Sequence, residues 1–301
     1  MNNLNTLTTS ELSDLIRNGD ISSEELVRTT LDSIQSNDNK INSFITVNKE
    51  DSIEKAKKVD KEMKNNSFEK TFLTGIPILI KDNISTKNVR TTAASKILEN
   101  YIPPYDSFVT KKIIESGGIV IGKGNLDEFA MGSSNETSYF GEVKNPWDLT
   151  RVPGGSSGGP AAAVSAGLVS CSLGSDTGGS IRQPAALCGV SGMKPTYGLV
   201  SRYGLIAFGS SLDQIGPIAR TAKDCGEILN IISGKDSRDS TSFEKHFEDF
   251  NSIIEHDIKG KKIGVPKEYI NNCDSKIKEV FNKSLLIYEN LGAEIIDISL
   301  P

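Results

Sequence analysis

Histidine is almost absent from this sequence, which has only His246 and His256 in 301 residues. Both lie in a polar stretch, far from any serine-rich segment. Histidine is the usual base for an attacking serine hydroxyl. The sequence therefore argues against a histidine-activated serine, and a serine enzyme built on this chain would need lysine as its base.

Other absences exclude further classes of protein. The four cysteines show no C-x-x-C spacing and no adjacent histidine, so we expect core-filling residues and no zinc site. The formal net charge of −5 argues against a large basic face for nucleic acid. No apolar run is long enough to span a membrane, and the N-terminus lacks the pattern of a secretory signal or transit peptide. We expect no membrane partner and a cytoplasmic protein, or an organellar one if a eukaryote encodes it.

The composition, 37% hydrophobic and 24% charged, is typical of a globular chain. We interpret residues 1–301 as one domain with a helical region (1–70), a glycine- and serine-rich catalytic core (71–232), a polar surface excursion (233–260) and the beginning of a C-terminal part (261–301). The order strand, helix, strand in that last part indicates an α/β fold. Because the chain stops directly after a strand, we expect a molecule truncated at its C-terminus.

Local patterns predict several elements. Thr8-x-x-Glu11 and Ser22-x-x-Glu25 have the spacing of helix-capping boxes. The further expected elements are a strand-like run at 72–84, a helix at 106–116, a strand at 118–122, a strand at 262–265, a helix at 275–291 and a strand at 294–298. Gly117–Lys123 nearly matches a phosphate-binding loop, but Gly124 stands where Ser or Thr is needed, and the interior indicates a strand.

Lys81 is the most unusual single residue, because it ends the apolar run Ile76-Pro77-Ile78-Leu79-Ile80. Burial lowers the pKa of a lysine, and a neutral amine is a competent general base. The alternative is a strand-end lysine that reaches solvent or pairs with Asp82.

Two glycine-serine segments follow, Gly154–Gly159 and Asp176–Ser180. Glycine permits close approach of the backbone to a substrate, and serine offers a hydroxyl that can attack a carbonyl or relay a proton. The N–H groups after Asp176 could converge on a developing oxyanion. Spacing alone nominates a Lys–Ser–Ser relay, and it leaves Ser157, Ser172, Ser175 and Ser191 open as participants.

Taken together, these motifs resemble the amidase signature family. The match covers Gly75-Ile-Pro-Ile-Leu-Ile-Lys-Asp82, Gly154-Gly-Ser-Ser-Gly-Gly159, Gly174-Ser-Asp-Thr-Gly-Gly-Ser-Ile-Arg-Gln-Pro-Ala185 and Gly192-Met-Lys-Pro-Thr-Tyr-Gly198. The resemblance implies Lys81 as base, Ser156 as the bridging serine after a cis peptide bond, and Ser180 as nucleophile. It implies an oxyanion hole of backbone N–H groups at Thr177, Gly178 and Gly179, continuing to Ser180. The implied fold is a large, mixed, mostly parallel sheet covered by helices on both faces.

Asn125–Gly141, Lys144–Asp148, Val200–Phe208 and Ser211–Pro217 resemble one branch of the family, the glutaminase subunits of tRNA-dependent amidotransferases. This resemblance implies hydrolysis of glutamine to supply ammonia for amidating Glu-tRNA(Gln), with Asp-tRNA(Asn) left open. It implies a heterotrimer with a B subunit, which would bind tRNA, ATP and Mg²⁺, and a small C subunit. We expect no cofactor and no metal on this chain. Met131, Gly132 and Ser133 are candidates for the substrate pocket, although a structural loop is an open alternative.

The resemblance has two departures. Proline occupies position 160, where the family has a small residue, and proline is tolerated in the first turn of a helix. Family members are also longer, and the residues that recognise glutamine's amino and carboxylate groups are expected beyond position 301. Two other interpretations stay open: a stand-alone amidase for small amides, and an inactive truncated scaffold.

Overall fold

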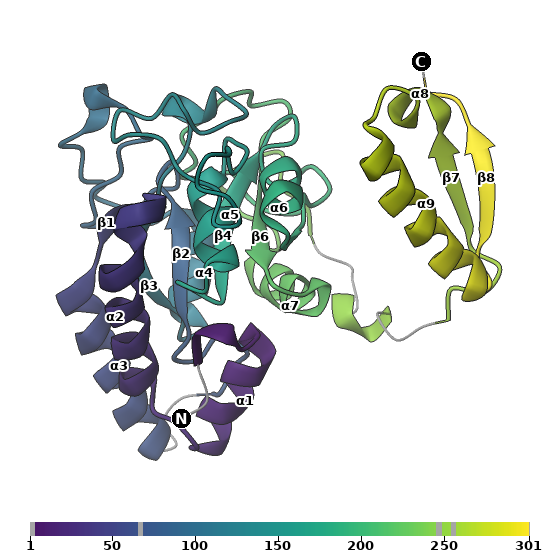
Figure 1. Ribbon diagram of the computed structural model, residues 1–301. Helices are drawn as coiled ribbons and strands as arrows, with labels where there is room; N and C mark the ends of the chain where they lie inside the picture. Colours follow the sequence, from purple (N-terminus) through teal and green to yellow (C-terminus); the bar gives the residue numbers. More distant parts are fainter. Residues whose placement is uncertain (1–3, 66–68, 245–248, 254–256, 301) are drawn as a thin grey trace. The chain divides into compact units, whose positions relative to one another are not determined.

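The computed structural model describes residues 4–65, 69–244, 249–253 and 257–300. The chain forms two compact units, 1–250 and 251–301, which are described separately (Figure 1). The helices are α1 Thr9–Asn18, α2 Ser23–Ile41, α3 Lys49–Lys64, α4 Phe108–Glu115, α5 Gly158–Ser165, α6 Arg182–Cys188, α7 Ala222–Ile232, α8 Lys267–Ile270 and α9 Ser275–Asn290. The strands are β1 Phe44–Val47, β2 Pro77–Lys81, β3 Ile119–Gly124, β4 Cys171–Asp176, β5 Ser191–Gly192, β6 Gln214–Ala219, β7 Lys262–Pro266 and β8 Glu294–Ile298.

A mixed sheet is the centre of the N-terminal unit. Within the described residues it has six strands in the order β1-β3-β2-β4-β6-β5. Strand β2 pairs in parallel with both β3 and β4, and the pairings toward the two edges are antiparallel. The α/β fold expected from the sequence is confirmed.

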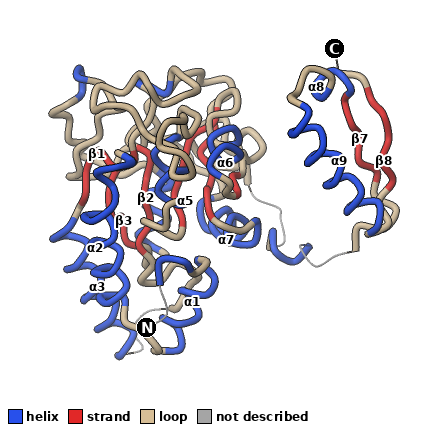
Figure 2. The backbone as a smooth tube through the Cα atoms, viewed as in Figure 1, coloured by secondary structure: helices blue, strands red, loops and turns tan. Residues whose placement is uncertain are grey.

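Helices cover both faces of this sheet. Ile78 and Ile80 of β2 pack with residues of α1, α4 and α7, whereas Leu79 packs with residues of α2 and α5. This division follows from the period of two along a strand, which sends successive side chains to opposite faces. The loops gather at one end of the sheet, shown in tan at the top of the N-terminal unit in Figure 2. Lys81 and Asp176 end two parallel neighbouring strands, so both lie at the same edge of the sheet.

The helix starts agree with their sequence signals. Thr8 caps α1 with a complete capping box to Glu11, and the side chain of Ser22 accepts a hydrogen bond from the N–H of Glu25 at the start of α2. The expected helix at 106–116 is α4, capped by Ser107. In the C-terminal unit, the expected strand, helix and strand are β7, α9 and β8, and the two strands pair in parallel.

Two expectations need correction. The strand predicted at 72–84 spans only Pro77–Lys81, because the chain turns before it: Ile76 N donates to Leu73 O at 3.0 Å and Gly75 has φ of 76°. Within the surface excursion predicted at 233–260, the described part 233–244 contains the buried Asp236 and Asp239: Asp236 accepts the Ser201 hydroxyl at 2.9 Å and Asp239 accepts the Arg202 N–H at 2.8 Å. His246 and His256 lie outside the described residues.

Candidate active site

Lys81 ends β2 inside the molecule, and its side chain is 0% exposed. Its Nζ lies 2.8 Å from Oγ of Ser156, 2.9 Å from Oγ of Ser157 and 2.9 Å from Oγ of Ser175. The burial expected from the apolar sequence around Lys81 is confirmed. The alternative is wrong, because Lys81 neither reaches solvent nor pairs with Asp82, whose ionic partner is Lys123.

Burial lowers the pKa of Lys81 from 10.5 to about 7. The main cause is loss of hydration of the ammonium form. The negative charges of Asp127, Asp176 and Asp213 act in the opposite direction and raise the pKa. Among the described residues no carboxylate forms a hydrogen bond or ion pair with Nζ, whose partners are hydroxyl and carbonyl oxygens. Near neutral pH, therefore, Lys81 is divided between its charged and neutral forms.

The hydrogen bonds distinguish Ser156 from Ser157, two of the three serines that contact Lys81. Oγ of Ser157 lies 3.1 Å from the carbonyl oxygen of Ser175, which can accept the Ser157 proton. Oγ of Ser156 has no partner other than Nζ of Lys81 among the described residues. The proton of Ser156 can therefore be directed to a neutral Lys81 amine, whereas that of Ser157 has an acceptor of its own.

The loop that carries Ser156 is tightly enclosed. Gly154 has φ of 85°, and the Gly155–Ser156 peptide bond is cis. A Cβ on Gly155 would lie 2.0 Å from Oδ2 of the buried Asp127. The N–H of Gly155 donates to Oε1 of Gln183 at 2.9 Å. The loop thus depends on glycine at 155 and on two side chains that the sequence did not single out.

Ser180 lies next to this loop at the other glycine-serine segment. The N–H of Ser157 donates to the carbonyl oxygen of Ser180 at 3.0 Å, which holds the two segments together. Ser180 is largely buried, with 9% of the residue exposed, whereas Ser156 is 0% exposed. No hydrogen bond of the described residues joins the hydroxyls of Ser180 and Ser156. Catalytic hydrogen bonds are commonly long before substrate binds.

Asp176 organises the segment that precedes Ser180. Its carboxylate accepts hydrogen bonds from the N–H groups of Gly179 at 2.7 Å and Ile181 at 3.0 Å, and from Nε of Arg182 at 3.0 Å. In this structure the N–H of Gly179, an expected oxyanion donor, is therefore already engaged. The N–H groups of Thr177 and Gly178 have no such partner within the described ranges, and the hydroxyl of Thr177 donates to Asp213.

The Met131–Ser133 segment borders the same loop. Met131 is exposed, and the carbonyl oxygen of Ser133 accepts a hydrogen bond from Nε2 of Gln183 at 2.9 Å. A Cβ on Gly132 would lie 2.3 Å from Cγ of Asp127. Gln183 and Asp127 thus connect the candidate substrate residues to the Ser156 loop.

Of the serines that the sequence left open, Ser157 and Ser175 contact Lys81, whereas Ser172 donates to the carbonyl oxygen of Pro160 at 3.1 Å and Ser191 lies in β5. Sequence analysis missed Asn83, whose Nδ2 lies 3.0 Å from Oγ of Ser175. Its position two residues after Lys81 was the available signal.

Other chemistries find little support here. The described residues contain no group of three or more His, Cys, Asp or Glu side chains that could hold a metal ion. Burial raises the pKa of Cys171, Cys188 and Cys225 to about 12, which removes them as nucleophiles at neutral pH. These three are core residues as expected, while Cys273 is only partly buried. No described helix is long and apolar enough to cross a membrane.

Comparison with known proteins places this geometry in context. A family model described as Amidase matches residues 25–301. The chain is 54% identical over 299 residues to the A subunit of glutamyl-tRNA(Gln) amidotransferase from Thermoanaerobacter pseudethanolicus, covering 99% of this chain and 61% of that protein. It is also 54% identical over 292 residues to the A subunit from Persephonella marina, covering 97% of this chain and 60% of the relative. The chain therefore spans about three fifths of the length of these relatives.

The chain is also similar to solved structures of an amidotransferase A subunit and of an amidase. The crystal structure of the glutamyl-tRNA(Gln) amidotransferase A subunit from Thermotoga maritima matches with a TM-score of 0.87 at 48% identity, covering 99% of this chain and 62% of that one. Native peptide amidase from Stenotrophomonas maltophilia matches with a TM-score of 0.91 at 30% identity, covering 98% of this chain and 62% of its own.

Proposed function

Since the chain belongs to the amidase family, we propose that it hydrolyses the side-chain amide of glutamine and supplies the ammonia to a tRNA-dependent amidotransferase. The observation that carries this proposal is the contact of 2.8 Å between Nζ of the buried Lys81 and Oγ of Ser156. The identity of 54% to the A subunit of glutamyl-tRNA(Gln) amidotransferase supports glutamine as the substrate.

In the proposed reaction, the neutral amine of Lys81 removes a proton from Ser156, and Ser156 removes a proton from Ser180. Oγ of Ser180 attacks the carboxamide carbon of glutamine. The proton held by Lys81 returns through Ser156 to the leaving nitrogen, so ammonia departs and a glutamyl ester of Ser180 remains. Water, deprotonated through the same relay, hydrolyses this ester and releases glutamate.

We assign the developing oxyanion to backbone N–H groups of the segment that ends at Ser180. Thr177 and Gly178 are the first candidates, because Asp176 already accepts the N–H of Gly179 at 2.7 Å. One such donor typically lowers the barrier by about 3–4 kcal/mol. The bonds of Asp176 to Gly179, Ile181 and Arg182 support a segment that is fixed before the substrate arrives.

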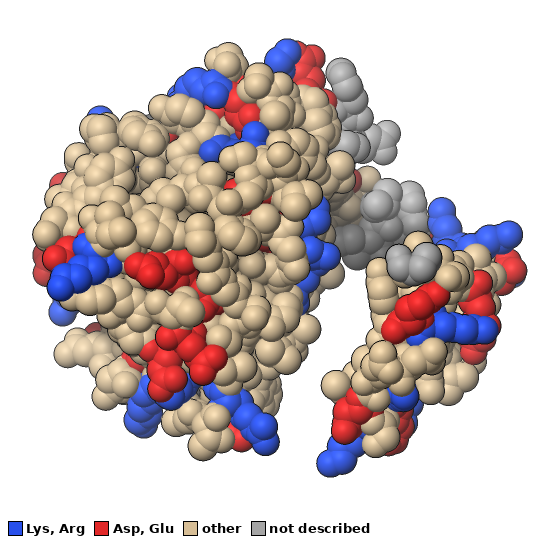
Figure 3. All heavy atoms as spheres, turned by 90° about the horizontal axis from the view of Figure 1, so that it is seen from above, with Lys and Arg blue, Asp and Glu red and all other residues tan. Residues whose placement is uncertain are grey.

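The wider assembly is also part of the proposal. The B subunit would bind the charged tRNA, ATP and Mg²⁺, and a small C subunit would complete a cytoplasmic heterotrimer. The net charge of −5 supports a tRNA site mainly on the partner. On the face of the N-terminal unit seen in Figure 3, blue and red side chains are scattered over a mostly uncharged surface.

A stand-alone amidase is the second candidate. The structural match to peptide amidase, with a TM-score of 0.91, is as close as the match to the amidotransferase from Thermotoga maritima, with 0.87. Because both enzyme types would use the same relay, the substrate separates them. Hydrolysis of simple amides at full rate without partners would favour this candidate.

A fluorophosphonate probe provides the first experiment, because it phosphonylates an activated serine. We expect labelling of the purified chain at Ser180 and none in Ser180→Ala. Glutamate release from glutamine, with and without candidate B and C subunits and charged tRNA, then tests the substrate. Labelling without glutamine hydrolysis under either condition would contradict glutaminase function, and absence of labelling would contradict the relay itself.

A further inference from the structure

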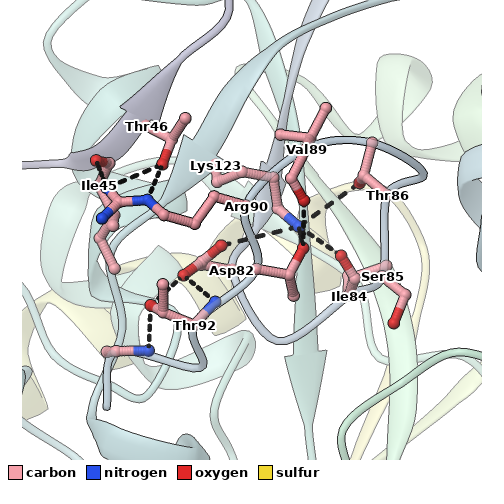
Figure 4. Close-up of polar contacts among 12 residues, drawn as sticks. Ile45, Thr46, Asp82, Ile84, Ser85, Thr86, Val89, Arg90, Thr92 and Lys123 are labelled. Atoms are coloured by element: carbon pink, nitrogen blue, oxygen red, sulfur yellow. Dashed lines mark hydrogen bonds and ion pairs between the residues drawn. The ribbon is translucent and has the colours of Figure 1, made fainter. Parts of the chain in front are cut away.

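A second buried lysine lies beside the catalytic strand and forms an ion pair. Lys123, in β3, and Asp82, directly after Lys81, are both 0% exposed, and Nζ of Lys123 lies 3.7 Å from Oδ1 of Asp82 (Figure 4). A buried pair of this kind stabilises a fold little relative to an apolar pair of similar volume. The contribution of the ion pair is therefore expected to lie in positioning the backbone segments that the two side chains bind.

Lys123 binds both ends of the loop that follows β2, and Asp82 binds the end at which the loop returns. Nζ of Lys123 donates to the carbonyl oxygen of Ile84 at 2.5 Å and to Oγ1 of Thr91 at 2.8 Å. Oδ2 of Asp82 accepts the N–H of Thr92 at 2.8 Å and its hydroxyl at 2.5 Å. Figure 4 shows Lys123 and Asp82 at the centre of these contacts. The pair thus fixes where the chain leaves β2 and where it turns back ten residues later.

The turn held by Asp82 supports the candidate substrate segment. Oγ1 of Thr92 accepts the N–H of Ala94 at 3.0 Å. The carbonyl oxygens of Ala93 and Ala94 accept the N–H groups of Phe129 and Tyr139, each at 2.9 Å. Phe129 and Tyr139 bracket Met131–Ser133, so the hydrogen bonds run from Asp82 to one residue on each side of this segment.

The backbone at this junction is strained on both sides. Ala93 and Ala94 have φ of 49° and 56°, and Phe129 and Ala130 have φ of 51° and 61°. Residues with a Cβ rarely adopt these angles, and they persist only where surrounding contacts hold them. Here the carbonyl oxygens of the strained alanines accept the N–H groups of the opposing segment, so loss of the Thr92 anchor would release both sides.

We propose that Asp82 and Lys123 are positioning residues that hold the 92–94 turn against residues 129–139 and thereby keep Met131–Ser133 in place beside the Ser156 loop. The role assigned to Met131–Ser133 rests on the proposed function. The hydrogen-bond path itself does not, since it can be measured without catalysis. Burial raises the pKa of Asp82 and lowers that of Lys123 to about 8, because each charge has lost its hydration.

Amide hydrogen exchange on the full chain tests the path. Thr92→Val removes the hydroxyl that links Asp82 to Ala94 and keeps a β-branched side chain. We expect exchange at Phe129 and Tyr139 to become about tenfold faster, as for the loss of one buried hydrogen bond. Thr74→Val is the matched control, because Thr74 is 1% exposed and accepts the N–H of Thr71 at 2.8 Å at the other end of β2. The control should leave both amides unchanged.

The double variant Asp82→Asn/Lys123→Met tests the pair itself without leaving an unpaired buried charge. Faster exchange at Phe129 and Tyr139 in a folded double variant supports the proposal. Wild-type exchange at both amides in Thr92→Val would overturn it, as would wild-type exchange in the folded double variant. If the double variant does not fold, Thr92→Val decides.

Glutamine kinetics provide a readout that a general loss of structure would not give. If the wild-type chain hydrolyses glutamine, Thr92→Val should raise KM about tenfold, while fluorophosphonate labelling of Ser180 stays within about threefold. Equal losses in both would overturn the positioning role. If the wild-type chain shows no hydrolysis with or without the candidate B and C subunits and charged tRNA, the proposed function fails, and hydrogen exchange still decides the inference.

Discussion

The lowered pKa of Lys81 predicts how the rate of Ser180 acylation depends on pH. A lysine in water with a pKa of 10.5 is neutral in roughly three molecules of ten thousand at pH 7. With the pKa lowered to about 7, the neutral fraction of Lys81 at that pH is about one half. Burial therefore increases the amount of available base roughly a thousandfold. If Lys81 is the base, the rate of Ser180 acylation should follow this neutral fraction.

The assay is the rate of fluorophosphonate labelling of Ser180 from about pH 5 to about pH 9 at constant ionic strength. We expect the rate to rise about tenfold per pH unit on the acid side, to bend near pH 7 and to level off above about pH 8. Lys81→Met keeps the length of the side chain without a titrating group. It should label roughly a thousandfold more slowly, with a flat profile.

The same pKa sets a stability trend. The folded-state pKa of Lys81 lies below its unfolded value, so the unfolded chain binds more protons between about pH 7 and 10.5. The contribution of Lys81 to the free energy of unfolding therefore rises with pH across this window. The pKa difference of roughly 3.5 between the unfolded and folded states corresponds to a destabilisation of the folded state by roughly 5 kcal/mol. This destabilisation applies in full below about pH 7. Folded Lys81→Met should lack this part of the pH dependence.

Two results would refute this reasoning. A wild-type labelling rate that is constant across the acid range would mean that no group titrating near pH 7 controls Ser180. A rate that still rises at about pH 9 would indicate an ordinary lysine with its pKa near 10. The folded state of every variant is checked by circular dichroism before its profile is interpreted.

Two further predictions concern the Ser156 loop. Ser156→Ala should slow labelling of Ser180 about a thousandfold, and Ser157→Ala only about tenfold. The smaller effect is expected because the Ser157 hydroxyl donates to the Ser175 carbonyl at 3.1 Å and is not the proposed bridge. The reverse order of rates would assign the bridge to Ser157. Gly155→Ala should abolish labelling and lower the melting temperature, because the added Cβ would lie 2.0 Å from Oδ2 of Asp127. Wild-type labelling in this variant would show that the loop can shift without loss of the activated serine.

Sequence reasoning found the residues that carry a distinctive local pattern. Lys81 was recognisable because a charged side chain ended an apolar run, and Ser156 and Ser180 because each followed glycines. Asp127 and Gln183 escaped notice because each is a single polar residue in an ordinary context. Their importance comes from folding, which brings Gln183 to Gly155 and to Ser133, residues 28 and 50 positions away.

Contacts between residues far apart in the chain could not be predicted from the sequence either. A count of serines could not say which hydroxyls of the 156–180 region face Lys81, since this depends on the face of β4 that carries Ser175. The run at 72–84 resembles one long strand because its apolar residues are continuous. The residues before Pro77, however, form a largely buried turn that lies outside the strand. Burial was thus predictable, whereas register and strand length were not.

The two buried lysines show how register decides chemistry. Lys81 is the last residue of β2 and Lys123 the last but one of β3, its parallel neighbour, yet Lys123 pairs with Ile80 and Lys81 pairs with Gly124. The register passes over Ile121, so β3 contains one extra residue between Val120 and Gly122. This bulge turns Lys123 to the face of Ile80, opposite to Lys81.

The opposite faces give the two amines different partners. Burial lowers the pKa of Lys123 to about 8, and the charge of the neighbouring Asp82 carboxylate opposes this shift by favouring the ammonium form. Among the described residues Lys81 meets three hydroxyls and no carboxylate; burial lowers its pKa to about 7, against the raising effect of the charges of Asp127, Asp176 and Asp213. A carboxylate neighbour makes a lysine a structural cation, whereas hydroxyl neighbours leave it free to exchange a proton. The bulge at Ile121 therefore separates a positioning lysine from the lysine that we propose as the base.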